Sequence, residues 1–484
     1  MMPSGRRRFP NGVVEGFYGR PWTHSARLSM ISFLGANGFN IYIYAPKSDQ
    51  YLRSAWRKAY PPRMKERLRA LMGAARESSV DFVFAVSPGL DIEYSSRTDR
   101  RVLLRRLRDV TGMQCLWVGI FLDDIEPKLV HASDRHGFRT LGEAHVALVN
   151  DVYDELVRDG NRLMFCPTYY ANDCLGKTAP ENEYLMEIGA GLARRVDVLW
   201  TGRKVVSTEI SEKDVGEFSR VIRRKPFLWD NYPVNDYYGD RPRLNLGPFE
   251  GRAPEILPLL AGYVSNPMNQ AEASKIPLLT LSDYLRDPVG YSPQKSLAHA
   301  VRRVFPGTHH RVGELLLDCT RAGPFDQHES VELRRVALEL MESFEDPRGG
   351  ERWKAASLIF ESKLRALLDL KGELPMGKNE GLLSELEPFT TKVKELAELG
   401  IVCLKLARAL RDGQRGLVRQ LRIEARRMAR SVKTNRVQAL GEVFFDDSAI
   451  EIGLPGTRME SPLLEFCGWS LKASKVQSAR SRGA

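Results

Sequence analysis

The sequence has no long run of apolar residues. None of its stretches comes near the roughly 18 consecutive apolar positions of a membrane-spanning helix, so such a helix is excluded. The first ten residues, MMPSGRRRFP, are basic, but no apolar stretch follows them, so a secretory signal is not predicted. From these absences we expect a cytoplasmic protein without membrane contact.

Cysteine and histidine are scarce and scattered. The six cysteines form no CxxC pair, a pattern that favours free thiols in a reducing compartment over disulfides. The eight histidines form no cluster, which argues against a zinc site. The sequence also lacks a glycine-rich phosphate loop followed by Lys and Ser or Thr. We therefore expect neither a metal nor a cofactor.

Basic residues are in excess, with a formal net charge of +11. Much of the excess lies in one segment, where basic residues recur at three- and four-residue steps and predict a single stripe along a helix. Such a stripe is either a solvated face or a docking surface for an acidic partner. It lacks the interleaved aromatic residues of a single-strand nucleic-acid binder, so we expect no nucleic acid. The stripe consists of Arg408, Arg411, Arg415, Arg419, Arg422, Arg426, Arg430 and Lys433.

Apolar runs typical of buried strands alternate with amphipathic segments in the first part of the chain. Most of these runs end in polar residues, Gly or Pro. They read NGVVEGFYG, NIYIYAP, DFVFAVSPG, LWVGIFLDD, RLMFCPT, VDVLWTG, KPFLWDN and AGYVSN. Eight strand–helix units over roughly 250 residues predict a TIM barrel, an α/β fold, in residues 9–290. A doubly wound open sheet is the alternative.

Strand patterns stop after about residue 290. Later segments carry the i, i+3, i+4 apolar pattern of packed helices, with a break at KGELPMGKNEG. We therefore expect residues 291–470 to form a mainly helical bundle. Composition also predicts a flexible basic amino terminus at residues 1–8 and a disordered basic tail at residues 471–484.

Polar and aromatic side chains gather at the ends of the predicted strands, where barrel enzymes carry their active sites. Carboxylates and amides can hydrogen-bond sugar hydroxyls, and aromatic rings can stack on a pyranose. A pyranoside substrate therefore fits this collection best. The strand-end residues are Glu15, Gly16, Lys47, Asp91, Asp123, Asp124, Tyr169, Tyr170, Trp200, Trp229, Asp230, Asn231, Asn235, Asp236 and Asn266.

Two of these carboxylates are adjacent. In WVGIFLDDIEP, Asp123 and Asp124 directly follow an apolar run. Glycosidases that use two carboxylates usually draw them from different strands, roughly 5 to 10 Å apart. Neighbours on one strand point to opposite faces, so we expect the two aspartates to serve different tasks, unless the pair merely ends the strand.

Nine motifs, in this order along the chain, resemble those of glycoside hydrolase family 84. They are VVEGFYGRPW, YIYAPK, SPGLDI, LDDIEP, FCPT, LWTGRKVVS, LWDNYPVND, LNLGPFEGR and SNP, and they cover about residues 9–285. The resemblance implies a bacterial, intracellular O-GlcNAcase, a β-N-acetylglucosaminidase that removes single sugars from Ser and Thr side chains. Some relatives were named hyaluronidases.

The resemblance also implies a substrate-assisted mechanism, an exception to the two-carboxylate scheme. The carbonyl oxygen of the 2-acetamido group attacks the anomeric carbon and forms an oxazoline. Asp123 is implied to orient the acetamido group, and Asp124 to act first as general acid and then as general base. These roles require separated pKa values, with the pKa of Asp124 raised enough to hold a proton.

Four positions are implied to contact the acetamido side of the sugar. Lys47 matches a lysine near the sugar and the acetamido group, and Tyr170 a tyrosine that holds the acetamido oxygen and the oxazoline. Trp229 and Asn231 match the walls of the acetamido pocket.

Three further positions are implied to contact the rest of the sugar. Gly16 would bring its backbone close to the hydroxyls, Asp236 would bind the 4- and 6-hydroxyls, and Asn266 would add one more contact. The sequence departs from the family at Tyr169, where a glutamate is common, which puts the peptide preference in doubt.

Other functions remain open at this point. Asp123, Asp124 and Glu126 are candidates to bind a divalent cation for phosphoryl or glycosyl transfer. A lectin-like barrel would hold GlcNAc without cleaving it, and a hydrolase of free glycans or hyaluronan fragments is a further alternative. The expected partners are O-GlcNAc-modified proteins or GlcNAc-containing glycans, and the helical region is a candidate for protein contact.

Overall fold

The computed structural model describes residues 8–157, 160–321, 323–325, 329–346, 348–374, 379–444, 452 and 458–480. The flexible amino terminus expected at residues 1–8 thus lies almost wholly outside the described residues. The chain forms two compact units, one made mainly of residues 8–236 and 249–291, the other of residues 237–248 and most of the chain from residue 292 onward. Within the described residues, no helix combines the length and apolar character needed to cross a bilayer.

The first unit is built on a closed barrel of eight parallel strands, in the order β1-β10-β9-β8-β5-β4-β3-β2. Strand β1 pairs with both β2 and β10, which closes the sheet and rules out the open-sheet alternative. The predicted TIM barrel is confirmed. The strands are β1 (Asn11–Glu15), β2 (Ile41–Tyr44), β3 (Asp81–Val86), β4 (Trp117–Phe121), β5 (Arg162–Cys166), β8 (Val196–Trp200), β9 (Phe227–Asp230) and β10 (Gly262–Ser265).

α-Helices connect the strands of the barrel from β1 to β9, whereas β9 and β10 are joined by a loop with two 3-10 helices, and α8 follows β10. Several begin at a side chain that accepts a hydrogen bond from the first turn, such as Thr23, Ser96, Thr140 and Ser211, and each such cap is worth about 1 kcal/mol. The helices are α1 (His24–Ala36), α2 (Pro62–Glu77), α3 (Arg97–Thr111), α4 (Ala132–Gly137), α5 (Leu141–Leu156), α6 (Glu183–Gly191), α7 (Glu212–Ile222) and α8 (Ala271–Arg286). A short hairpin, β6 (Asp173–Cys174) and β7 (Lys177–Thr178), follows β5.

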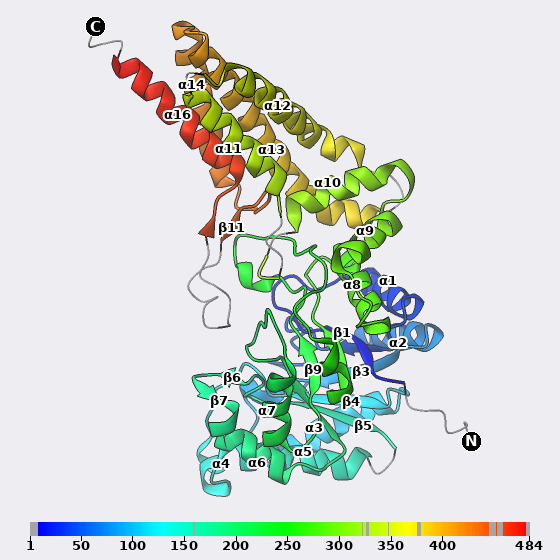
Figure 1. Ribbon diagram of the computed structural model, residues 1–484. Helices are drawn as coiled ribbons and strands as arrows, with labels where there is room; N and C mark the ends of the chain where they lie inside the picture. Colours follow the sequence, from blue (N-terminus) through cyan, green and yellow to red (C-terminus); the bar gives the residue numbers. More distant parts are fainter. Residues whose placement is uncertain are drawn as a thin grey trace. The chain divides into compact units, whose positions relative to one another are not determined.

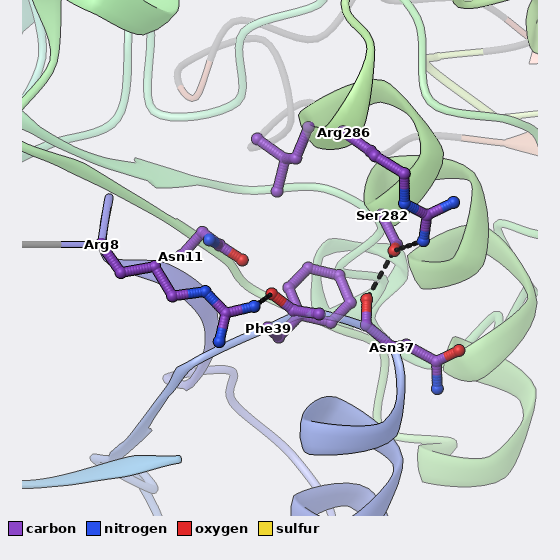
Figure 2. Close-up of a pocket in the computed structure, with 8 residues that line it drawn as sticks. Arg8, Asn11, Asn37, Phe39, Ser282 and Arg286 are labelled. Carbon is purple, nitrogen blue, oxygen red and sulfur yellow. Dashed lines mark hydrogen bonds between the residues drawn. The ribbon is translucent and has the colours of Figure 1, made fainter. Parts of the chain in front are cut away.

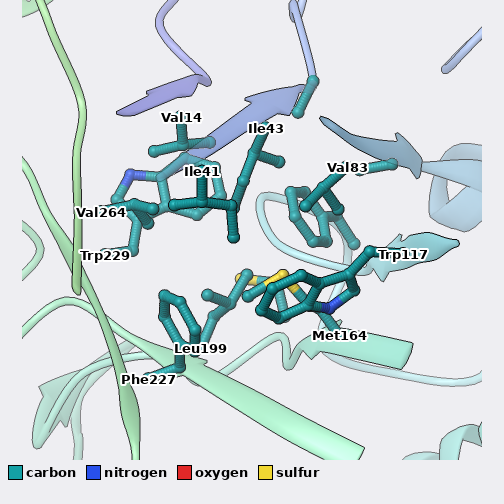
Figure 3. Close-up of a cluster of buried hydrophobic side chains, with 14 residues drawn as sticks. Val14, Ile41, Ile43, Val83, Trp117, Met164, Leu199, Phe227, Trp229 and Val264 are labelled. Carbon is teal, nitrogen blue, oxygen red and sulfur yellow. The ribbon is translucent and has the colours of Figure 1, made fainter. Parts of the chain in front are cut away.

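Apolar side chains from the strands fill the barrel interior. Val14, Ile41, Val83 and Leu199 are fully buried there, and Trp229 closes the cluster from β9 (Figure 3). Burying one such side chain contributes roughly 1.5 to 3 kcal/mol. The interior is therefore a packed core, and chemistry is confined to the ends of the barrel.

A cavity of about 220 Å³ lies at the amino-terminal end of the strands, where Asn11 begins β1 (Figure 2). Its two arginines already have partners, since Arg8 donates to the carbonyl of Gly38 (3.1 Å) and Arg286 pairs with Asp283 (3.2 Å). TIM-barrel enzymes work at the carboxyl-terminal end, so this cavity is not the candidate active site.

The second unit is mainly helical, as predicted. Its long helices α11, α12, α13, α14 and α16 run side by side (Figure 1). The expected break at residues 371–381 separates α12 from α13. The helices are α9 (Pro293–Val304), α10 (His310–Thr320), α11 (Val331–Glu345), α12 (Gly350–Glu373), α13 (Glu380–Arg411), α14 (Arg415–Thr434) and α16 (Pro462–Arg480), with a small strand pair, β11 (Val443–Phe444) and β12 (Arg458–Met459).

Two predictions about this unit are wrong. The basic stripe does not lie on one helix, because Gly413 takes a left-handed φ of 68° and separates α13 from α14, so that Arg408 and Arg411 belong to α13. The tail expected to be disordered is helical up to Arg480, since α16 begins before it and packs against α13 and α11. Residues 481–484 lie outside the described residues.

Candidate active site

The two adjacent aspartates lie just beyond the carboxyl end of β4. The N–H of Leu122 still donates to the carbonyl of Cys166 (2.9 Å), which extends the pairing with β5 by one residue. Asp124 then turns the chain with a φ of 53°, in the left-handed region that residues with a Cβ seldom adopt. This conformation costs about 1 kcal/mol, so the surrounding contacts must hold the turn in place.

Lys47, which follows β2, lies against both carboxylates. Its ammonium forms an ion pair with Oδ2 of Asp123 and lies 3.5 Å from Oδ2 of Asp124. The expectation that the two side chains point to opposite faces is wrong, because Asp124 lies in a turn and not on a strand. Burial lowers the pKa of Lys47, but the two aspartates raise it more, so the lysine stays charged.

The second oxygen of Asp123 is a buried acceptor. Asp123 is 7% exposed, and within the described part of the chain no group donates a hydrogen bond to its Oδ1. An unsatisfied buried acceptor costs roughly 1 to 3 kcal/mol, so native structures rarely retain one without a use for it. The geometry therefore presents one carboxylate oxygen to a donor from a ligand.

Both oxygens of Asp124 accept hydrogen bonds from tyrosines. Tyr18 donates to Oδ2 (2.7 Å) and Tyr170 to Oδ1 (2.8 Å). Burial raises the pKa of Asp124, but the Lys47 ammonium and the two hydroxyls lower it more, so it lies below its ordinary value. The expected raised pKa is therefore wrong for the protein without substrate.

A connected set of side chains forms the wall beside Lys47. The indole N–H of Trp229 donates to Oδ1 of Asn231 (3.0 Å), which also accepts from the Asn266 amide (2.9 Å). Oδ1 of Asn266 in turn accepts from the backbone N–H of Gly16 (3.3 Å). A Cβ on Gly16 would lie 2.2 Å from the Trp229 ring, so only glycine allows this close approach.

Asp236 lies at the same end of the barrel, after β9. Its Oδ2 accepts from the backbone N–H of Tyr18 (2.7 Å). Burial raises the pKa of Asp236, partly offset by that backbone N–H. The structure thus brings all nine predicted site residues to the mouth of the barrel. They form two groups of contacts, one around Lys47 and Tyr18 and the other around Trp229, and the Lys47 ammonium lies 6.0 Å from the centre of the Trp229 ring.

Other predicted strand-end carboxylates already have counter-ions. Glu15 pairs with Arg27 (2.7 Å), and Asp91 pairs with Arg57 (2.6 Å). The charges of these two carboxylates are compensated within the protein, so they are not candidates for the proton transfers of the site.

The charge of Asp230 is likewise compensated by a buried arginine. It pairs with Arg252 (2.6 Å) at full burial and accepts from the Tyr263 hydroxyl (2.5 Å). Asp230 thereby anchors the end of β9, which carries Trp229 and Asn231.

Two residues at the mouth were not predicted. Tyr18 follows Gly16 in the same motif, so the motif itself was the available signal. Arg53 donates to the Tyr18 hydroxyl (3.0 Å) and to the carbonyl of Asp124 (3.3 Å). It comes from the loop after β2 and has no local sequence signal, because only the fold brings it next to Asp124.

The divalent-cation alternative finds little support in this geometry. Lys47 lies between the two carboxylates, where a cation would bind, and Glu126 pairs with Lys128 (3.2 Å). Among the residues that the structure describes, no group of three or more His, Cys, Asp and Glu side chains is arranged to hold a metal ion.

Comparison with known proteins identifies the family. A family model described as beta-N-acetylglucosaminidase matches residues 11–316, more than half of the chain. The chain belongs to the β-N-acetylglucosaminidase family. The predicted resemblance to glycoside hydrolase family 84 is therefore confirmed.

Members of this family are similar to this chain over different parts of its length. Protein O-GlcNAcase of Rattus norvegicus is 39% identical over 282 residues, which are 58% of this chain but only 30% of the rat protein. A solved O-GlcNAc hydrolase mutant of Thermobaculum terrenum is similar over 98% of this chain and 96% of its own, with 28% identity and a TM-score of 0.87. The structure of CpGH84B covers 96% of this chain, and 77% of CpGH84B is matched, with 25% identity and a TM-score of 0.78.

Proposed function

We propose that the protein is a retaining exo-β-N-acetylglucosaminidase that removes O-linked GlcNAc from Ser and Thr of proteins by substrate-assisted catalysis. The observation that carries this proposal is the buried, unsatisfied Oδ1 of Asp123 beside the hydrogen-bonded carboxylate of Asp124. One oxygen is ready to accept an N–H, and the next residue carries a carboxyl that can exchange a proton.

The first step uses the substrate's own nucleophile. The acetamido N–H donates to Oδ1 of Asp123, while Lys47 holds Oδ2. The acetamido oxygen then forms a bond to the anomeric carbon as the bond to the leaving oxygen breaks. Asp124 transfers a proton to that oxygen, so the serine or threonine departs as a neutral hydroxyl.

Asp124 must hold a proton for this step, although its pKa is lowered in the free protein. The hydroxyl of Tyr170 now stabilises its charged form. If Tyr170 turns to the acetamido oxygen when the sugar binds, Oδ1 of Asp124 becomes available to the glycosidic oxygen. Losing a hydrogen bond to the charged form raises the pKa, which favours the protonated acid.

The second step returns the site to its starting state. Asp124, now ionised, takes a proton from a water molecule as the water oxygen attacks the anomeric carbon. The bond from that carbon to the acetamido oxygen breaks, which restores the acetamido group. Two successive inversions leave the β-configuration unchanged.

The remaining pocket residues bind the sugar in this proposal. Trp229 and Asn231 enclose the acetamido methyl, the Gly16 backbone and Asn266 contact hydroxyls, and Asp236 binds the 4- and 6-hydroxyls. Two of the similar proteins are named for O-GlcNAc, which supports protein-linked GlcNAc as the substrate.

The proposal that the substrate is a protein is tested by comparing the release of GlcNAc from different substrates. We expect faster release of GlcNAc from an O-GlcNAc peptide than from chitobiose or a hyaluronan fragment, at equal concentration and with product quantified by chromatography. Faster cleavage of the free glycans would favour the alternative of a glycan hydrolase. Binding of GlcNAc with no release from any of them would favour the lectin-like alternative.

A further inference from the structure

His145, in the middle of α5, is a buried titratable group that the proposed chemistry does not use. It is fully buried, and both ring nitrogens have partners: Nδ1 lies 2.9 Å from the Tyr184 hydroxyl and Nε2 lies 2.8 Å from the Tyr94 hydroxyl. Burial lowers the pKa of His145 to about 3, so the ring is neutral at neutral pH.

Both hydroxyls are held by the same ring. The neutral ring donates a hydrogen bond from one nitrogen and accepts one at the other, so either tautomer joins Tyr184 to Tyr94. The Tyr184 oxygen also accepts from the backbone N–H of Thr168 (3.1 Å), which links the ring to the loop after β5. A neutral histidine suits this place because it offers one acceptor and one donor on opposite sides of a small ring.

Tyr184, His145 and Tyr94 form a hydrogen-bonded bridge with two arms, one from each tyrosine. The arm that begins at Tyr184 reaches the residue before the aspartate pair. Beyond Tyr184, the hydroxyl of Thr168 donates to the carbonyl of Leu122 (2.8 Å), the residue directly before Asp123. Leu122 is thus held at its N–H by Cys166 and at its carbonyl by Thr168. These two bonds fix the chain immediately before the left-handed turn at Asp124.

The other arm holds the far end of the same loop. The backbone N–H groups of Tyr94 and Ser95 donate to the two carboxylate oxygens of Asp134 (3.0 and 2.6 Å). Asp134 lies on α4, the helix that follows the aspartate pair, and is 1% exposed. His145 therefore connects the loops after β3, β4 and β5.

We propose that His145 is a positioning residue for Asp124, acting through the hydroxyls of Tyr184 and Tyr94. This inference rests on the proposed function, in which Asp124 protonates the leaving oxygen. A small displacement of an acid from its productive geometry slows proton transfer strongly, whereas substrate binding, made by other residues, changes little.

The first test is Tyr184→Phe, which removes one hydroxyl of the bridge and leaves the ring. The readout is kcat/KM, which covers steps up to departure of the leaving group, for methyl and dinitrophenyl β-N-acetylglucosaminides. We expect about a tenfold loss on the methyl glycoside and less than about twofold on the activated one, with KM nearly unchanged. His145→Phe should give the same pattern.

Tyr284→Phe is the matched control. Tyr284 is also buried in the barrel unit and donates to the carbonyl of Ala253 (3.1 Å), outside the bridge. We expect this variant to match the wild-type protein on both substrates. A double variant, Tyr184→Phe with Thr168→Val, should lose no more than the larger single loss, because both changes break the same arm.

The outcomes separate the two proposals. A loss confined to the methyl glycoside supports the positioning role. Equal losses on both substrates, additive losses in the double variant, or activity equal to that of Tyr284→Phe overturn it while leaving the proposed function intact. If the wild-type protein cleaves neither glycoside, the proposed function fails and the positioning role fails with it.

Discussion

Asp124 is the single residue on which both proposed proton transfers depend. For Asp124→Ala we expect kcat/KM on a methyl β-N-acetylglucosaminide to fall by about 10²- to 10⁴-fold, with a much smaller loss on the dinitrophenyl glycoside. The reason is that only the poor leaving group needs a proton to depart. The measurement is steady-state kinetics on the two glycosides, and equal slowing of both would count against the assignment.

Replacement of Asp123 is expected to reduce activity on glycosides with poor and with good leaving groups alike. Asp123→Asn keeps the size of the side chain but removes the negative charge that favours the developing positive charge on the acetamido N–H. Because bond formation by the acetamido oxygen accompanies the departure of every leaving group, activated glycosides should not fully restore activity. If the dinitrophenyl glycoside recovered fully, the roles of the two aspartates would have to be exchanged.

Replacing Tyr18 tests the electrostatics of Asp124 through the pH dependence of kcat/KM. Its hydroxyl donates to the charged form of Asp124 and helps to lower the pKa. Removing that bond in Tyr18→Phe raises the pKa, so Asp124 keeps its proton to higher pH. The alkaline fall of kcat/KM on a methyl glycoside should therefore move to higher pH, and Arg53→Met should move it the same way. A fall at unchanged or lower pH would contradict the described electrostatics.

At the residue level, the sequence predicts what lies next to a strand end. Asp123, Asp124 and Lys47 each close an apolar run, so the barrel prediction places them together. Arg53 and His145 have no such signal, since one lies in a loop and the other on a helix. The pKa of Asp124 also depends on hydroxyls that approach it from two other loops.

At the scale of elements, the end of β9 depends on a buried ion pair. Arg252 donates to both oxygens of Asp230 and also to the carbonyls of Ser207 and Thr208, which ties β9 to the loop after β8. The burial of this pair is complete, so neither charge is solvated when its partner is missing.

Replacement of this arginine should therefore destabilise the barrel. For Arg252→Met we expect a loss of about 3 to 5 kcal/mol in the free energy of unfolding, because Asp230 becomes an unpaired buried charge. Arg286→Met is the control, since the Arg286 side chain is 67% exposed in its pair with Asp283 and its replacement should cost no more than about 1 kcal/mol. Urea unfolding followed by tryptophan fluorescence measures both, and equal losses would contradict this role for the pair.

The sequence largely predicted where the strands and helices lie, but it predicted less well where individual helices begin and end. Apolar runs of the right length mark all eight barrel strands because both faces of these strands are buried. The basic stripe was assigned to one helix because its spacing continues across residues 408–433, yet Gly413 interrupts the helix. The tail was expected to be disordered from composition alone, which does not register the packing of α16 on α13.

At the scale of the whole molecule, the chain combines a barrel unit, which carries every predicted site residue, with a helical unit. Arg415, Arg419 and Arg430 are exposed on α14, so the stripe expected to be solvated or to meet an acidic partner is accessible within its own unit. Docking of an acidic partner there stays a prediction. The proposed chemistry requires only residues of the barrel unit.

The central claim is that the substrate's acetamido group is the nucleophile. It is tested most directly by comparing hydrolysis of an aryl β-N-acetylglucosaminide with that of the matching aryl β-glucoside, in the presence of EDTA and with Asp124→Ala alongside. We predict cleavage of the acetamido sugar alone, unaffected by EDTA and strongly reduced in the variant. Equal cleavage of the two sugars would mean that the protein supplies the nucleophile and would contradict the role of Asp123.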